Sequence, residues 1–216
     1  MSITNATGTI VAVASTYGTS SNMTAITNAT EAVATLAAAH GVVVGDYLEV
    51  TSGWDRLTGR IVRAKTVATN DVTFENINTT STTTYPAGTG TGSIRRITAW
   101  TNLSQLTKDL AVSGGDQNFA NITTLTDTVE KQLPTTRSPV TVRLPLYDDP
   151  SLAWVSVVQT ATDGTVPTGM RMSFPNGSKL VANAYWSLGT VPTIEDSTLR
   201  NVIDLAFVAV PVRYAT

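Results

Sequence analysis

The stretch from Gly169 to Trp186 constrains the fold most, because it carries the turn chemistry of a β-hairpin, GMRMSFPNGSKLVANAYW. Pro175 suits the first central position of a type I turn, Asn176 tolerates the second, and Gly177 can take the left-handed conformation that completes a three-residue loop with a bulge. This turn predicts the facing pairs Phe174 with Ser178, Met172 with Leu180, and Met170 with Ala182. The alternative, a two-residue Asn-Gly turn, shifts the partners by one residue and mixes the two faces.

The preferred register makes one face of the hairpin largely apolar and the other polar. The polar face carries Arg171, Ser173, Lys179, Asn183 and Tyr185. A strand that must bury only one face is typical of a sheet whose other face meets solvent or a second protein.

The chain around the hairpin predicts a helix and two strands. Residues 140–146 alternate apolar and polar side chains, which indicates a half-buried strand. Asp149 and Pro150 have the chemistry of a helix cap and first helical position, so we expect a helix over about 150–161. Residues 198–214 read as the last and longest strand, and its apolar later part suggests a central position in a sheet or contact with a neighbouring subunit.

The first half of the chain predicts a compact all-β unit. Its strand candidates are 46–51, 59–67 and 71–77, with Trp54, Leu57, Ile61 and Phe74 as the expected core. Residues 31–39, rich in Ala, favour a helix by propensity, and a strand through 32–36 is nearly as well supported. Residues 78–93 have low complexity and are interpreted as a mobile surface loop or a linker that orders only on assembly.

Further along, residues 118–133 are expected to form one long strand or a bent pair of strands. We place a boundary between the two halves, giving a small N-terminal β module over 1–92 and a second domain over 93–216. One arrangement that this boundary allows is a module inserted into the second domain, with residues 1–18 joining that domain.

Charge argues against a protein that grips nucleic acid. The chain of 216 residues has a net charge of −2 and only 14% charged residues, so it lacks a basic field for phosphate. A surface that DNA slides past without binding remains compatible with this charge. The polar surface must come largely from Thr, Ser, Asn and Gly, and Thr is a residue favoured in strands.

The sequence also lacks the residues that most catalytic and metal sites need. There is no Cys, and the only histidine is His40, which is more simply explained as a turn residue at a strand entrance. No apolar run approaches the ~18 residues needed to span a bilayer. The N-terminal region is a poor secretion signal, so we expect synthesis in the cytoplasm and no membrane partner.

The second half resembles a known family in six places. These are Trp100-Thr101 followed by SGGDQNF at 113–119, EKQLPT at 130–135, DDPSLAW at 148–154, RMSFPNGSKLVANAYWS at 171–187, and PVRY at 211–214. Together they resemble the major tail tube proteins of phages with long, non-contractile tails, the siphovirus type. The resemblance covers about 93–216, and the hairpin and the helix are its most specific parts.

This resemblance implies a mainly β fold, a β-sandwich or barrel with one flanking α-helix, to which the small N-terminal β module is added. It implies a structural virion protein and no enzyme, without cofactor, metal or catalytic residues. Subunits close into rings, usually hexameric, which stack into a hollow tube that conducts DNA. The implied partners are other copies of the chain, a tape-measure protein, a tail terminator, distal tail or baseplate proteins, and DNA that passes without specific binding.

Two other classes of function are weighed against the tail tube. One is a virion or cell-surface decoration or binding module, which Thr-rich strands also suit. The other is a glycan-degrading enzyme with paired carboxylates, for which Asp127 and Glu130 have no convincing partner acid. The polar face of the hairpin, with Arg171, Lys179 and Asn183, is a candidate for the lumen or for a subunit contact. Eight residues are candidate contacts between subunits: Arg95, Arg96, Arg143, Arg171, Lys179, Val208, Val210 and Val212.

Overall fold

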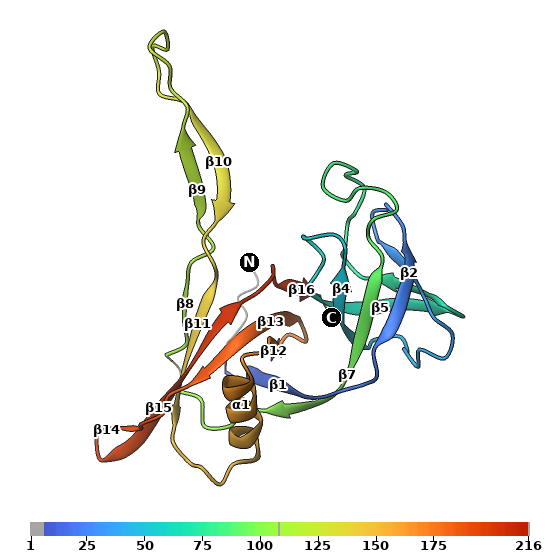
Figure 1. Cartoon of the computed structure of the whole chain (residues 1–216). Coiled ribbons are helices and arrows are strands. Elements are labelled where there is room, and N and C mark those ends of the chain that lie inside the picture. The colour runs from blue at the N-terminus through green and yellow to red at the C-terminus, as the bar shows by residue number, and fades with distance from the viewer. Residues whose placement is uncertain (1–6, 108, 216) are drawn as a thin grey trace.

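A closed barrel and an open sheet share one strand, β7 (Gly92–Asn102), in the computed structural model of the chain (Figure 1). The structure describes residues 7–107 and 109–215. The start of β7 pairs with β2 and β4 of the barrel, and its end pairs with β1 of the open sheet. The fold is therefore mainly β with one flanking helix, as the sequence predicted.

The barrel closes because β2 pairs both with β3 and with β7. Its strands lie in the order β2-β3-β6-β5-β4-β7. Besides β7 they are β2 (Ser21–Ile26), β3 (Val33–Leu36), β4 (Tyr47–Ser52), β5 (Ile61–Ala68) and β6 (Asp71–Phe74). The four core residues expected from the sequence, Trp54, Leu57, Ile61 and Phe74, are all buried inside it.

The open sheet continues from β7 in the order β1-β12-β13-β15-β11-β8. Its strands are β1 (Ile10–Tyr17), β12 (Thr168–Ser173), β13 (Lys179–Leu188), β15 (Thr198–Phe207), β11 (Thr141–Tyr147) and β8 (Ala111–Ser113). Two short strands are attached, β14 (Thr193–Glu195) to β15 and β16 (Val212–Tyr214) to β13. The remaining strands, β9 (Gln117–Asn121) and β10 (Gln132–Arg137), pair with each other.

Helix α1 (Ala153–Gly164) covers one face of the open sheet and packs mainly on β13. It buries Trp154 and Val158 against the inward residues of the sheet, among them Leu144 of β11 and Ile203 of β15. β11 alternates buried and exposed positions as its sequence predicted. The helix therefore closes a second hydrophobic core, separate from the core of the barrel.

The hairpin of β12 and β13 has the predicted register. Met170 is paired with Ala182 and Met172 with Leu180, and the Phe174 amide donates to the Ser178 carbonyl over 2.9 Å. Gly177 has φ of 82°, the left-handed conformation that the turn requires. The three-residue loop is thus confirmed over the two-residue alternative.

Two expectations from local sequence are wrong. Residues 31–39 form no helix; the alternative expectation of a strand through 32–36 is confirmed, because β3 occupies 33–36 and pairs with β2 and β6. A short Ala-rich segment gains little as an isolated helix, and here alternate residues enter the barrel core. Helix α1 begins at Ala153, because the Asp149 carboxylate accepts hydrogen bonds from the Ser151 amide and hydroxyl and does not cap the helix.

The low-complexity loop before β7 is packed against the barrel, contrary to the expectation of a mobile loop or linker. Thr79 is fully buried, and its hydroxyl donates to the Thr27 carbonyl over 2.8 Å. The Tyr85 ring lies 5.1 Å from the ring of Trp54. At Gly90 a Cβ atom would lie 2.5 Å from Trp54, so the glycine permits close packing that its composition did not suggest.

The predicted last strand is interrupted. β15 ends at Phe207, paired with Ala184, and β16 resumes with Val212 paired with Val181. Between these two pairs the chain advances by five residues, from Phe207 to Val212, while β13 advances by only three, from Ala184 to Val181. The surplus residues bulge out of the sheet. Pro211, which has no amide proton for a sheet hydrogen bond, lies in this interruption.

Replacing Gly177 with Val should lower the free energy of unfolding by about 1–3 kcal/mol, because a β-branched residue is strained at positive φ. Urea denaturation of the purified monomer measures this. Gly164→Ala is a matched control at a position where nothing lies within 4 Å of a new Cβ, and it should cause no loss. Equal stability of Gly177→Val and the unmodified chain would contradict the role of the turn.

Tyr17 should make the fold sensitive to alkali. Burial raises the pKa of its phenol to about 12, although the Gly169 amide donates to its oxygen over 2.8 Å. The unfolded phenol ionises near pH 10, so its contribution to stability is complete below that pH and is lost as the pH rises towards 12.

The urea midpoint should therefore fall more steeply between pH 9 and pH 11 in the unmodified chain than in Tyr17→Phe. The variant also lacks the hydrogen bond from Gly169, so the comparison rests on the slope with pH and not on the absolute midpoint. Parallel slopes would show that Tyr17 does not contribute to the alkaline sensitivity.

Candidate functional site

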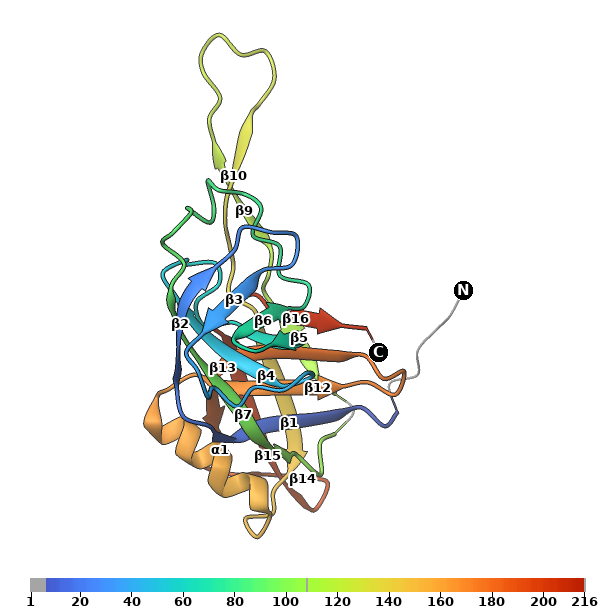
Figure 2. The same ribbon diagram turned by 90° about the vertical axis from the view of Figure 1, so that its right-hand side faces the viewer.

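Residues 117–137, here called the arm, form a ribbon that projects from the open sheet (Figures 1 and 2). All residues of β10 and most of β9 are exposed. Five of the exposed side chains are large and apolar: Phe119, Ile122, Leu125, Val129 and Leu133. An isolated two-stranded ribbon is marginally stable in water, and clustered exposed apolar residues indicate an interaction surface. The arm is therefore the first candidate contact region.

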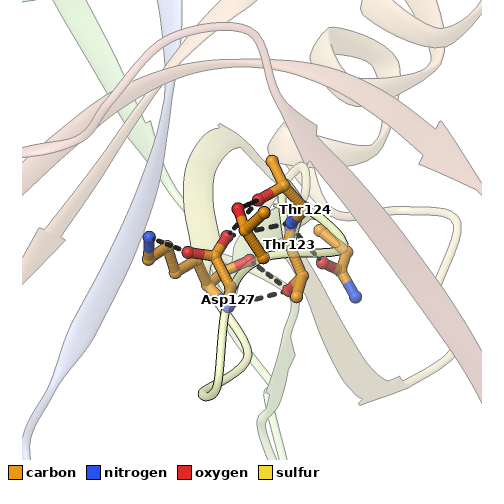
Figure 3. Close-up of polar contacts among 6 residues, drawn as sticks. Thr123, Thr124 and Asp127 are labelled. Atoms are coloured by element: carbon orange, nitrogen blue, oxygen red, sulfur yellow. Dashed lines mark hydrogen bonds and ion pairs between the residues drawn. The ribbon is translucent and has the colours of Figure 1, made fainter.

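A small network of polar side chains orders the loop that joins β9 to β10 at the far end of the arm (Figure 3). The Asp127 carboxylate accepts hydrogen bonds from the amide and hydroxyl of Thr124, each over 2.9 Å, and forms an ion pair with Lys131. These partners, Lys131 foremost, lower the pKa of Asp127. Leu125 stands beside this network with its side chain fully exposed. The network thus holds an apolar side chain out in solvent.

The polar face of the β12–β13 hairpin is largely covered by the barrel. Asn183 is 2% exposed, and its amide nitrogen donates to Glu49 over 2.9 Å. The Arg171 guanidinium lies 4.7 Å from the ring centroid of Trp100. Our expectation that Asn183 faces a lumen or another subunit is wrong, because the barrel packs on this side of the sheet. Lys179 is half-buried at the end of β13.

Arg95 and Arg96 of β7 both have partners within the chain. Arg95 pairs with Glu49 over 2.5 Å and stacks on the ring of Tyr17. Arg96 bonds to the Gly41 carbonyl and pairs with Asp46 over 3.4 Å. Both arginines, predicted as candidate subunit contacts, thus form ion pairs within the fold.

The face of the open sheet opposite α1 carries polar side chains. Arg143 of β11 and Asp204 of β15 are register partners there, and Ser187 and Tyr185 of β13 lie beside them. All four are exposed. A shallow hollow of about 340 Å³ lies on this face between β13 and β15. The face is polar, open and balanced in charge.

The sequence profile of the family described as "Phage tail tube protein, TTP" matches residues 52–216. The chain belongs to this phage tail tube protein family. It is therefore a structural protein of phage tails, and the resemblance seen in the sequence is confirmed. The matched region includes the arm, every strand of the open sheet except β1, and strands β5, β6 and β7 of the barrel.

Other comparisons add little to this assignment. A search of curated proteins gave no significant match. A chain in the cryo-EM structure of the anti-feeding prophage (AFP) baseplate, 6-fold symmetrised, shares 7% identity, over 55% of the tail tube protein and 86% of that chain. The TM-score is 0.38, at which the likeness carries no structural argument.

The described part of the chain contains neither a cluster of metal-ligating side chains nor a helix that could span a membrane. Residues 7–107 and 109–215 contain no group of three or more Asp, Glu or His side chains placed to hold a metal ion. Helix α1 is not long and apolar enough to cross a bilayer. His40 contacts the Thr69 carbonyl and the Val42 amide, which agrees with its predicted place in a turn.

The three valines predicted as subunit contacts differ in how far their side chains are exposed. Val208 and Val210 are exposed in the bulge between β15 and β16. Val212 is 5% exposed and packs in the barrel core, so it has little surface left for a neighbour. The three valines differ in exposure because Val208 and Val210 lie in the interruption between β15 and β16, whereas Val212 is the first residue of β16.

Sequence reasoning missed the β14–β15 hairpin. Its turn at Asp196 and Ser197 has positive φ at both residues, which suits a tight hairpin. Ile194 and Leu199 are register partners beside this turn, and both are exposed. Asp and Ser between two short apolar runs were the available signal.

Replacing residues 117–137 with Asn-Gly should leave the melting temperature of the monomer unchanged. Residues 116 and 138 are already joined by a hydrogen bond of 2.9 Å, so a two-residue turn can close the shortened hairpin. No arm side chain belongs to either hydrophobic core. Calorimetry measures the outcome, and a large drop in melting temperature would show that the arm supports the fold.

Proposed function

We propose that the chain is the major tail tube subunit of a phage with a long, non-contractile tail. In this proposal subunits close into rings, with six subunits as the expected number. The rings stack into a hollow tube through which the phage DNA reaches the host. The proposal rests on the family and on the surfaces that the single subunit leaves unpaired.

The arm is the observation that supports this function best. Its apolar side chains contact nothing in the chain's own cores, and its strands pair with each other and with no strand of either layer. A second copy of the chain can cover such a surface while offering its own arm to a third copy. Contacts of this head-to-tail kind propagate into a filament, whereas a self-complementary contact stops at a dimer.

We further propose that the exposed part of the sheet face opposite α1, around Arg143, Asp204 and Tyr185, lines the lumen; the barrel covers the rest of this face at Asn183. Arg143 and Asp204 sit opposite each other on this face, and their charges cancel. Tight binding of DNA requires an excess of Lys and Arg to neutralise phosphates and release counterions. A balanced polar wall lets DNA pass without specific binding.

The remaining assignments follow from the same proposal. A tape-measure protein would occupy the forming tube, a terminator would cap it, and distal tail or baseplate proteins would join its other end. We also retain the division into an N-terminal module, 1–92, and a tube domain, 93–216. The boundary falls at the start of β7, the strand that pairs with both the barrel and the open sheet.

Negative-stain microscopy of the concentrated, purified chain tests the proposal. We expect rings or hollow tubes for the unmodified chain, and loss of tubes when residues 117–137 are replaced with Asn-Gly. The melting temperature of the variant serves as the control for folding. A monodisperse monomer at high concentration, with affinity for a glycan or a cell surface, would instead support a decoration or binding module.

A further inference from the structure

Two exposed apolar patches lie at opposite ends of β15. The first, here called the tip, consists of Val191, Ile194 and Leu199 around the β14–β15 hairpin. The second, here called the bulge, consists of Val208 and Val210, which follow the last residue of β15. β15 runs from the tip to the bulge, and from Leu199 to Val208 it spans roughly 30 Å of extended strand. Figure 1 shows the hairpin at one end of this strand and the arm rising from the other.

The backbone itself presents both patches to solvent. At the tip, the left-handed residues Asp196 and Ser197 form a tight turn that sets Ile194 opposite Leu199. At the bulge, the Val208 amide still donates to the Asn183 carbonyl of β13 over 2.9 Å, and the residues that follow it leave the strand pairing until β16. The bulge also adjoins the base of the arm, because the Phe207 amide donates to the Val140 carbonyl over 3.0 Å.

We propose that the tip of one subunit seats on the bulge of a second copy of this chain in the next ring. This inference rests on the proposed tube and adds the surfaces through which its rings meet. The two patches differ and point away from each other along one strand. Each subunit can therefore use its tip on one neighbour and its bulge on another, and the contact repeats along the tube axis.

The charges around the two patches permit this contact. The tip carries Glu195 and Asp196, both largely exposed, with Arg200 as their partner within the chain. The base of the arm presents the exposed cations Arg137 and Arg143, with Asp116 and Asp204 nearby. The acidic tip therefore meets a surface without a net negative charge, and Arg137 and Arg143 are available to it.

The contact between one tip and one bulge is small, so the proposed stacking depends on several such contacts around each ring. Taking roughly 100 Å² of apolar surface for a fully exposed side chain of this size, the tip and bulge together present on the order of 300 Å². A stable pair of proteins buries about 1,600 Å² in total. One tip on one bulge is too small to hold two free subunits, but several such contacts around a ring, joined by the arms, act together.

The test uses a pair of charges introduced at the proposed contact. Val210→Asp places a carboxylate in the bulge, and Ile194→Lys places an ammonium in the tip. Both side chains are well exposed in the monomer, 63% and 79%, so the melting temperature should be unchanged. Val44→Asp is the matched control, because Val44 is 64% exposed on a barrel turn outside both patches.

Each variant alone should form few or no tubes, because its new charge would be buried against an apolar patch. An equal mixture should form tubes again, since an Asp bulge can meet a Lys tip while the other junctions remain apolar. Val44→Asp should assemble like the unmodified chain. Sedimentation and negative-stain microscopy, under conditions where the unmodified chain forms tubes, measure all four samples.

Two results would overturn the tip-to-bulge contact. One is normal tube formation by either single variant, and the other is defective assembly of both without recovery in the mixture. Failure of the unmodified chain to form rings or tubes would instead count against the proposed function itself. The two failures are therefore distinguishable.

Discussion

The packing of the barrel against the open sheet holds the structure together. β7 passes from one layer into the other, and side chains from both layers meet beside it. Glu49 of the barrel accepts hydrogen bonds from Asn183 of the sheet and Arg95 of β7. Tyr214 of β16 accepts a hydrogen bond from the Arg63 amide of the barrel over 2.7 Å. The Tyr47 and Tyr214 rings lie 6.3 Å apart at this junction. Because these contacts bury the inner side of the β12–β13 hairpin, they decide which surfaces remain free for assembly.

The free surfaces share a physical property. The arm, the tip and the bulge expose apolar side chains on short or irregular elements that bury little surface of their own. Such elements have limited stability as parts of a monomer, but they gain partners when copies of the chain assemble. The two hydrophobic cores hold the subunit together independently of them. The division of roles suits a subunit that folds first and polymerises later.

Local sequence predicted the elements whose structure depends on near neighbours. Gly177 and Pro175 specified the hairpin register, and alternation specified the buried positions of β11. Prediction failed where distant contacts compete with local preference. Residues 33–36 became a strand because β2 and β6 flank them, and Asp149 bonded Ser151 in place of the helix. The covering of Asn183 depended on Glu49, which lies 134 residues away in the chain.

The sequence by itself determined a mainly β chain with one helix, a hairpin of defined register, and membership of the tail tube family. These follow from turn chemistry, from periodicity and from motifs that are local in the chain. Only the tertiary structure decided which apolar residues are left uncovered. Val210 and Val212 are two residues apart and chemically identical, yet one lies in the bulge and the other in the barrel core. Whether a side chain is buried depends on which distant residues pack around it in the folded chain. The identity of the side chain alone does not specify its burial.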